Sequence, residues 1–377
     1  MVTVAGTNGK GSVVTYVEAI LRSAGYRTGA YTSPHVRHFA ERVKTTGDCV
    51  SDASFCAAFE RVESARGDQS LSFFEYTTLA ALLLFAEAGL DCVILEVGLG
   101  GRLDAVNIID ADLAVITSIG RDHEQWLGSD LRGIAKEKAG VVRSGRSVVI
   151  ADSASAQFLV DPVADKGAEP IIAGLDYQMA RQEDGTWSLT SKDQTYTGLP
   201  RPALAGDVQY ANAAAAIVAV LRSGLLVDRE SIDEGIGTAH LPGRIQCLGT
   251  DPELIVDVCH NADSAAVLAR WLESQPKRYT RAVFGVMKDK DLSAMVRVLA
   301  RHVEHWYACS PKLSRSMSQQ QLGLRLADLG CTSTSCDSVA AAVNTAISAS
   351  HIKDRILIIG SFHTVDEALL ALEQRDG

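Results

Sequence analysis

The chain has 377 residues, of which 47% are hydrophobic and 22% charged, a composition typical of a globular protein with room for two domains. The net charge of −10 argues against nucleic acid as a main partner, because phosphate backbones bind to basic surfaces. No apolar stretch reaches membrane-spanning length, and the eight cysteines form no Cys-x-x-Cys pair. We therefore expect no membrane partner, no disulfide framework, and a reducing cytoplasm.

A glycine-rich turn follows a predicted strand at residues 2–5 and leads into a predicted helix over 12–24. The turn, Gly6-Thr7-Asn8-Gly9-Lys10-Gly11-Ser12, would expose backbone N–H groups beside the positive end of that helix, where phosphate groups bind. Lys10 would add a mobile cation. The match to the common phosphate-binding loop is imperfect, because the first glycine is absent and Gly11 stands where a hydroxyl residue should follow the lysine. A plain glycine-rich turn stays open as an alternative.

Apolar runs alternate with helical patterns in the rest of the first half. Strands are predicted at 28–31, 92–97, 113–117 and 147–151, and helices at 51–66, 74–88 and 208–223. Apolar runs without polar alternation suit parallel strands that are covered on both faces. The order of elements therefore predicts a doubly wound α/β domain, and the short alternating segments at 176–197 predict a small antiparallel excursion from it.

The segment Leu241-Pro242-Gly243-Arg244 interrupts this pattern. A second alternation follows it, with strands predicted at 254–258, 282–285 and 356–360. We therefore predict two α/β domains, at residues 1–243 and 244–377. A parallel strand seldom starts at the second residue of a chain, so we also expect that an N-terminal segment is missing.

Polar side chains follow the predicted parallel strands, at the edge of the sheet where α/β proteins bind ligands. Ser33 and His35 follow one strand, Glu96 lies at the end of another, and Asp122 and His123 follow a third. A hydroxyl, a carboxylate and an imidazole could hold a divalent metal beside a triphosphate, although magnesium prefers oxygen ligands. For His123 alone, a helix-capping or hydrogen-bonded structural role is the simpler interpretation.

Two further polar segments have ordinary structural interpretations. Lys138 lies near the end of a predicted helix, where most lysines are solvated. Asp257 to Asn261 ends a strand of the second domain, and Asn261 would cap the next helix.

Taken together, these motifs resemble the Mur ligase superfamily and, within it, the bifunctional dihydrofolate synthase/folylpolyglutamate synthase family. The resemblance covers nearly the whole chain. It rests on the glycine-rich turn and on Thr32-Ser33-Pro34-His35, Phe73-Phe74-Glu75-Tyr76-Thr77-Thr78, the run from Glu96 to Asn107 with its Gly-Gly-Arg-Leu-Asp, Asp122-His123, Glu137-Lys138-Ala139-Gly140, Leu241-Pro242-Gly243-Arg244, Asp257 to Asn261, and Gly360-Ser361-Phe362-His363-Thr364.

The resemblance implies a P-loop parallel-sheet ATPase domain followed by a smaller Rossmann-like α/β domain. It implies an ATP-dependent amide ligase that adds L-glutamate to dihydropteroate and to tetrahydrofolate through an acyl phosphate. ATP and Mg²⁺ are the implied cofactors, and the family is commonly monomeric.

The resemblance also assigns roles to individual residues. ATP would be held by Thr7, Asn8, Gly9, Lys10, Gly11, Ser12, Asn212, Arg244, Asp257 and His260. Magnesium ions would be bound by Ser33, Glu96 and His123. Lys138 would be carbamylated and would support the second metal, and with Lys10 and His123 it would form the catalytic set. Phe74 and Asp104 would contact the pterin.

The chain departs from the family pattern at two places. Ala262 replaces a proline after the His-Asn pair, which concerns only local loop geometry. The N-terminal stretch that helps to bind dihydropteroate and folate is lacking, so we expect that the pteridine site could be incomplete. The alternatives are another ligase of the superfamily, a simple kinase, and a non-catalytic nucleotide-binding remnant.

Overall fold

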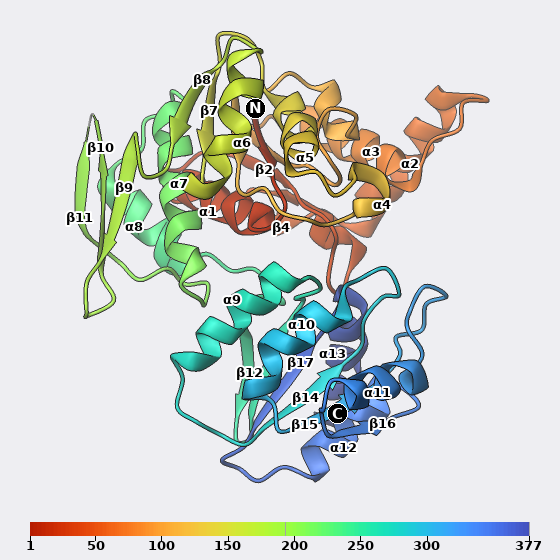
Figure 1. Ribbon diagram of the computed structural model, residues 1–377. Helices are drawn as coiled ribbons and strands as arrows, with labels where there is room; N and C mark the ends of the chain where they lie inside the picture. The colour runs from red at the N-terminus through yellow and green to blue at the C-terminus, as the bar shows by residue number, and fades with distance from the viewer. Residues whose placement is uncertain (193, 377) are drawn as a thin grey trace. The chain divides into compact units, whose positions relative to one another are not determined.

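The computed structural model describes residues 1–192 and 194–376, and the chain divides into two compact units. Unit 1 comprises residues 1–203 and 208–241, whereas unit 2 comprises residues 204–207 and the chain from 242 onward. Each unit is an α/β domain (Figure 1), so the predicted fold class is confirmed. In the described part of the chain, no helix combines the length and the apolar composition needed to span a membrane.

An eight-stranded sheet forms the centre of unit 1, in the order β4-β3-β2-β5-β1-β6-β7-β8. Its strands are β1 (Val2–Ala5), β2 (Thr28–Tyr31), β3 (Val43–Thr45), β4 (Asp48–Cys49), β5 (Cys92–Glu96), β6 (Leu113–Ile116), β7 (Ser147–Ile150) and β8 (Glu169–Ile172). Six neighbouring strands, β2, β5, β1, β6, β7 and β8, run parallel to one another. The edge strand pair differs, because β3 pairs antiparallel with both β2 and β4. The carboxyl ends of the parallel strands therefore meet at one edge, where the candidate site lies.

Helices cover both faces of this sheet (Figure 1). They are α1 (Lys10–Ser23), α2 (Asp52–Arg66), α3 (Phe73–Glu87), α4 (Glu124–Leu127), α5 (Leu131–Lys138), α6 (Ser153–Ala164), α7 (Val208–Arg222) and α8 (Arg229–Thr238). Helices α1, α7 and α8 pack together. Helices α3, α5 and α6 contribute Phe85, Ala135 and Leu159 to the core on the other face. Because both faces are covered, the central strands β1, β5, β6 and β7 are buried over almost their whole length and are mainly apolar.

A three-stranded antiparallel sheet extends unit 1, as the alternating segments predicted. It consists of β9 (Tyr177–Arg181), β10 (Trp187–Ser191) and β11 (Thr195–Leu199). Trp187 is fully buried, and its indole Nε1 donates to Pro200 O at 2.8 Å. The Trp187 ring meets Tyr210 of α7 edge-on, which attaches the small sheet to the main body of the unit.

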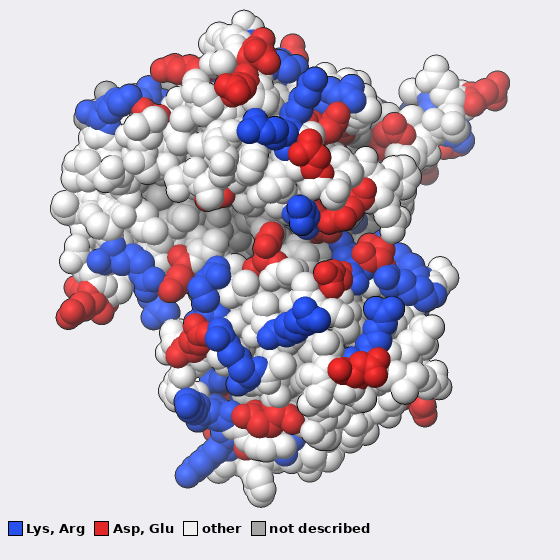
Figure 2. Space-filling view, in the orientation of Figure 1, with Lys and Arg blue, Asp and Glu red and all other residues white. Residues whose placement is uncertain are grey.

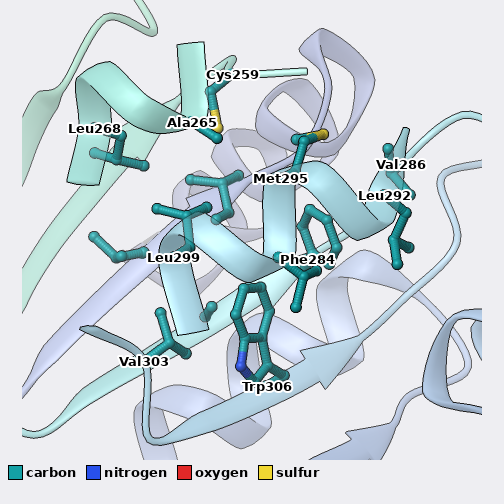
Figure 3. Packing of buried hydrophobic residues seen from close by; sticks show 14 of the residues in the cluster. Cys259, Ala265, Leu268, Phe284, Val286, Leu292, Met295, Leu299, Val303 and Trp306 are labelled. Carbon is teal, nitrogen blue, oxygen red and sulfur yellow. The ribbon is translucent and has the colours of Figure 1, made fainter. Parts of the chain in front are cut away.

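Unit 2 is built on a six-stranded sheet in the order β12-β13-β17-β14-β15-β16. Its strands are β12 (Gln246–Thr250), β13 (Glu253–Asp257), β14 (Thr280–Phe284), β15 (His305–Ala308), β16 (Ser333–Ser335) and β17 (Arg355–Ile359), and its helices are α9 (Ala262–Glu273), α10 (Leu292–Leu299), α11 (Gln319–Asp328), α12 (Val339–Ser348) and α13 (Phe362–Asp376). Only the β12–β13 pair is antiparallel. Trp306, Phe284 and Met295 lie at the centre of its core (Figure 3).

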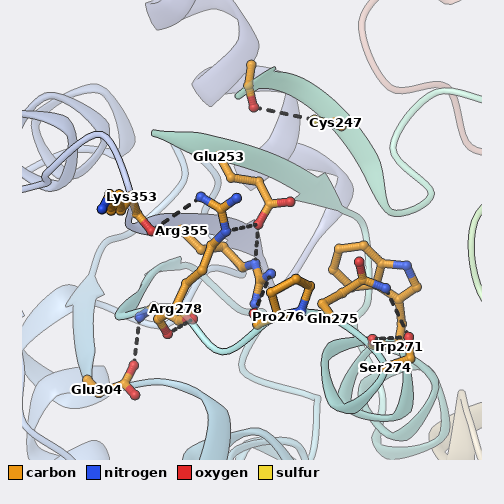
Figure 4. A network of polar contacts seen from close by, with 12 residues as sticks. Cys247, Glu253, Trp271, Ser274, Gln275, Pro276, Arg278, Glu304, Lys353 and Arg355 are labelled. Atoms are coloured by element: carbon orange, nitrogen blue, oxygen red, sulfur yellow. Dashed lines mark hydrogen bonds and ion pairs between the residues drawn. The ribbon is translucent and has the colours of Figure 1, made fainter. Parts of the chain in front are cut away.

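Charged groups in unit 2 are paired at the start of its strands. The guanidinium of Arg355 is buried and bonds Glu253 of β13, and Arg278 lies beside the same carboxylate (Figure 4). On the face that Figure 2 shows, Lys and Arg are interspersed with Asp and Glu. The ion pairs of Glu253 with Arg355 and Arg278 lie at the end of the sheet opposite the carboxyl edge, so they support the fold rather than the candidate site.

Candidate active site

The phosphate-binding loop joins β1 to α1, and two of its positions require glycine. Gly6 has φ +147°, and a Cβ there would lie 1.9 Å from Thr117 Oγ1. Gly9 has φ +87°, and a Cβ there would lie 2.9 Å from Asn212 Oδ1, so Asn212 of α7 lies directly over the loop. Helix α1 begins at the next residue, Lys10. The loop therefore has the geometry of an anion-binding helix N-terminus.

The segment after β6 holds this loop in place, a contact that the motif did not reveal. Thr7 N donates to Ser118 O at 2.8 Å, and Asn8 N donates to Ser118 Oγ at 3.1 Å. Thr117 Oγ1 donates to Asn8 O at 2.6 Å, and Gly120 N donates to Thr7 Oγ1 at 2.9 Å. Two amides of the loop are thus already bonded within the protein, and the loop cannot shift without the segment that leads to His123.

Two lysines meet at one backbone carbonyl. Lys10 Nζ donates to Gly6 O at 3.1 Å and to Thr7 O at 3.2 Å, and Lys138 Nζ donates to the same Gly6 O at 2.9 Å. Only 4% of Lys138 is exposed. The interpretation of Lys138 as a solvated helix lysine is therefore wrong. Burial first, and then the charge of Lys10, lower the pKa of Lys138 to about 7.

Ser33 and Glu96 are brought together at the edge of the sheet. Glu96, buried at the end of β5, accepts a hydrogen bond at Oε2 from Ser33 N at 3.1 Å. A Cβ on Gly11 would lie 3.6 Å from the same oxygen, so the carboxylate also faces the first turn of α1. A hydroxyl and a carboxylate beside a phosphate loop therefore offer oxygen donors to a hard cation.

His123 precedes the short helix α4. Its backbone is left-handed, with φ 53°, and its N–H donates to Asp122 Oδ1 at 2.8 Å. His123 occupies the N-cap position of α4, but its side chain makes no capping hydrogen bond, so of the two structural interpretations only a hydrogen-bonded role stays open beside metal binding. In the described residues, no three His, Cys, Asp or Glu side chains form a closed metal cage. The donors present suit Mg²⁺, which keeps water and phosphate among its ligands.

Phe74 of α3 and Asp104 both contact the loop that follows β5. The Phe74 ring stacks on Tyr31 at 5.8 Å, and a Cβ on Gly98 would lie 2.6 Å from Phe74 Cζ. Asp104 is buried, and its carboxylate accepts hydrogen bonds from Leu99 N at 2.8 Å and Val106 N at 3.0 Å. Burial raises the pKa of Asp104, and these bonds oppose the rise. Asp104 thus fixes the loop after β5, and its contact with a pterin stays a prediction.

The same loop packs against the end of α5 through two glycines that motif reading did not explain. A Cβ on Gly101 would lie 2.7 Å from Glu137 O, and a Cβ on Gly140 would lie 2.4 Å from Arg102 Cα. Arg102 N donates to Glu137 O at 2.8 Å. This close approach of two backbones determines where Lys138 points.

In unit 2, the remaining candidates gather at the carboxyl ends of β13 and β17. Asp257 is buried and accepts hydrogen bonds from Ile245 N and Cys259 N, both at 2.8 Å. The Arg244 guanidinium lies 5.5 Å from the Phe362 ring centroid, and the His260 ring lies 6.0 Å from it. Asn261 caps α9, as expected, by accepting from Ser264 N at 2.9 Å. Arg244, Asp257 and His260 therefore lie close together in unit 2, and their contact with a nucleotide stays a prediction.

Comparison with known proteins decides the family. The Mur ligase middle domain matches residues 4–220, and the Mur ligase glutamate ligase domain matches residues 243–362. The chain is 41% identical over 374 residues to the dihydrofolate synthase/folylpolyglutamate synthase of Escherichia coli strain K12, covering 99% of this chain and 86% of that protein. The chain belongs to the dihydrofolate synthase/folylpolyglutamate synthase family of Mur ligases.

Solved structures of this family have the same fold. E. coli FolC in complex with DHPP and ADP matches with a TM-score of 0.95 at 40% identity, covering 100% of this chain and 89% of that one. A bifunctional folylpolyglutamate synthase/dihydrofolate synthase with Mn, AMPPNP and L-glutamate bound matches with a TM-score of 0.92 at 40% identity, covering 99% and 89%. The resemblance drawn from the motifs is therefore confirmed.

Proposed function

We propose that this chain is an ATP-dependent ligase that adds L-glutamate to dihydropteroate and to tetrahydrofolate. The observation that carries the proposal is the meeting of Lys10 and Lys138 at Gly6 O, with buried Glu96 facing the first turn of α1, in a chain that matches its family over both domains. Relatives with ADP, AMPPNP, Mn, L-glutamate or DHPP bound support ATP, a divalent cation and these substrates.

The chemistry follows from the weakness of a carboxylate as an electrophile. The substrate carboxylate attacks the γ-phosphorus of ATP, ADP leaves, and an acyl phosphate forms. The α-amino group of glutamate then attacks the acyl carbon, loses a proton, and inorganic phosphate departs with the C–O bond electrons. Phosphoryl transfer depends on positioning and charge neutralisation, which Lys10 and the amides at the start of α1 would supply.

Magnesium would be held by Ser33, Glu96 and His123, and it would neutralise charge on the phosphates. Carbamylation of Lys138 fits this arrangement. A second ammonium next to Lys10 would be repelled by a dication, whereas a carbamate offers oxygen atoms to a hard ion. Asn212, Arg244, Asp257 and His260 are proposed to bind the nucleotide, and Phe74 and Asp104 the pterin.

Glutamate-dependent release of phosphate tests the proposal. We expect release from ATP when glutamate is present with dihydropteroate in one sample and with tetrahydrofolate in another. Release with tetrahydrofolate alone would restrict the enzyme to polyglutamylation. ATP hydrolysis that ignores glutamate would indicate a kinase, and ATP binding without hydrolysis would indicate a binding protein. A cell-wall precursor as the productive substrate would indicate another Mur-type ligase.

We also propose that the protein acts as a monomer in the cytoplasm, without nucleic acid. All eight cysteines are free, including buried Cys259 and Cys309, as suits a reducing compartment. Light scattering during size-exclusion chromatography should give a mass near 40.2 kDa. A mass twice that value would contradict the monomer.

Replacing Lys10 by methionine is expected to weaken ADP binding about 10- to 100-fold, the usual loss when a charged hydrogen-bond donor is removed. The Lys10 ammonium lies over the loop on the Gly6 and Thr7 carbonyls, where the phosphates would lie. Calorimetric titration with magnesium and ADP measures the change. Lys136→Met, on the exposed side of α5, serves as the control, and equal affinity in both variants would contradict the role.

A further inference from the structure

Arg42 is a buried cation beyond the carboxyl end of β2. It ends the 3₁₀ turn Phe39–Arg42 and is 6% exposed. Its guanidinium packs against two aromatic rings, 5.6 Å from the centroid of Phe39 and 5.4 Å from that of Phe73. The Phe73 ring is itself 64% exposed. The two rings also meet each other edge-on, with centroids 6.1 Å apart, so the cation packs against an aromatic pair of which one ring borders solvent.

The polar contacts of Arg42 leave part of its hydrogen-bonding capacity unused. Its Nε donates to His35 Nδ1 at 2.8 Å, which makes that ring nitrogen an acceptor, and the guanidinium also bonds the Tyr31 hydroxyl. Among the described residues, no carboxylate forms an ion pair with Arg42. Glu41, the adjacent acid, is occupied by the N–H groups of residues 36, 37 and 38 at 2.7–2.8 Å. A guanidinium has five N–H donors, and a buried one without an anion is costly.

The electrostatic surroundings show what Arg42 faces. Burial lowers the pKa of Arg42, and the Tyr31 hydroxyl and then the Glu96 carboxylate are the chief groups that oppose the shift. Tyr31 stacks on Phe74, a predicted pterin contact, whereas Glu96 accepts from Ser33, a predicted metal ligand. Arg42 is therefore close enough to interact with both Tyr31 and Glu96.

We propose that Arg42 binds the substrate carboxylate that is to be activated. The inference rests on the proposed function, in which this carboxylate must join the ring-binding residues to the γ-phosphate of ATP. The terminal nitrogens of a guanidinium match a carboxylate in a planar, two-point contact. The contacts with the two neighbouring rings and the hydrogen bond to His35 hold Arg42 in place before substrate arrives, which lowers the entropy lost on binding.

The test separates recognition of the carboxylate from general packing. Pteroic acid and its primary carboxamide are titrated into the full-length protein with magnesium and AMPPNP, for wild type, Arg42→Gln, Arg42→Lys and the exposed control Arg27→Gln. We expect Arg42→Gln to weaken binding of the acid about 10-fold or more and to change binding of the carboxamide less than about 2-fold. Arg42→Lys should lose an intermediate part of the affinity for the acid and should bind the carboxamide as wild type does. Arg27→Gln should change neither.

Equal losses for the acid and the carboxamide, or no loss for either, would overturn the assignment. A thermal melt shows whether Arg42→Gln is folded. If Arg42→Gln is unfolded, the affinities of Arg42→Lys for the acid and for the carboxamide test the assignment instead. A wild-type protein that binds neither ligand and shows no glutamate-dependent ADP release would overturn the proposed function together with this inference. If the wild-type protein is active but the Arg42 variants show no selective loss of affinity for the acid, this inference alone would be overturned.

Discussion

Replacing Lys138 by alanine is expected to reduce ligase turnover about 100-fold or more, a loss comparable with removal of one group that stabilises transition-state charge. The side chain is buried, and its nitrogen lies 2.9 Å from Gly6 O in the phosphate loop. Phosphate release in the presence of glutamate measures the loss. Lys136→Ala on the same helix has an exposed side chain and should retain wild-type turnover. Full turnover in Lys138→Ala would contradict the catalytic role.

Carbamylation of Lys138 should depend on pH in a defined direction. Only the neutral amine reacts with carbon dioxide, and the pKa of Lys138 is lowered to about 7 by burial and by Lys10. The amine is therefore protonated below pH 7 and neutral above it. In ¹³C-bicarbonate, a carbamate carbonyl signal should be present at pH 8, fall as the pH drops through 7, and be absent from Lys138→Ala. A wild-type protein without the signal at pH 8 would contradict the modification.

Replacing Gly140 by alanine is expected to lower the free energy of unfolding by about 3 kcal/mol, near the upper end of the usual cost of overpacking. The added Cβ would lie 2.4 Å from Arg102 Cα, and a backbone atom cannot move aside as a flexible side chain can. A loss of this size lowers the melting temperature by about 6 to 12 °C in a domain of this length. Ligase activity should also fall, because Lys138 is only two residues away.

Gly133→Ala is the matched control for this change. Gly133 also belongs to α5, but its added Cβ would lie 3.4 Å from Asp130 Oδ2, an ordinary contact. Alanine is a better helix former than glycine by up to about 1 kcal/mol. The melting temperature of Gly133→Ala should therefore equal or exceed that of wild type. If both variants melt alike, the packing of the Gly101–Asp104 loop on α5 does not determine stability.

Much of the fold could be predicted because glycines that end helices and apolar runs that form buried strands can be recognised within a short stretch of sequence. Helix α2 ends at Arg66 because Gly67 follows with φ 55°, and β5 was predicted because a parallel strand that is covered on both faces has no polar alternation. The strands β3, β4 and β16 could not be predicted. They are two or three residues long, and β4 and β16 are largely exposed, so only pairing with a neighbouring strand makes them strands.

The site could be predicted only in part. The phosphate loop is a local motif, and its geometry follows from Gly6 and Gly9. The burial of Lys138 depends instead on the contact of Gly140 with Arg102, residues that are distant in sequence. No local pattern contains that contact, so position alone gave the wrong interpretation, and only the family resemblance pointed to a role. Arg42 escaped notice for the same reason, since its aromatic neighbours come from two separate segments.

The path of the chain between the two units limits how this protein could be divided or recombined. Residues 204–207 belong to unit 2 although the chain then returns to unit 1 for 208–241. Ala205 packs against the core of unit 2. A gene fragment that starts at residue 242 would therefore encode a domain without part of its own core, and the complementary fragment would carry that part. Exchange of whole domains between related ligases must transfer two segments at once, and a single crossover near the second boundary would leave each hybrid with a mismatched core.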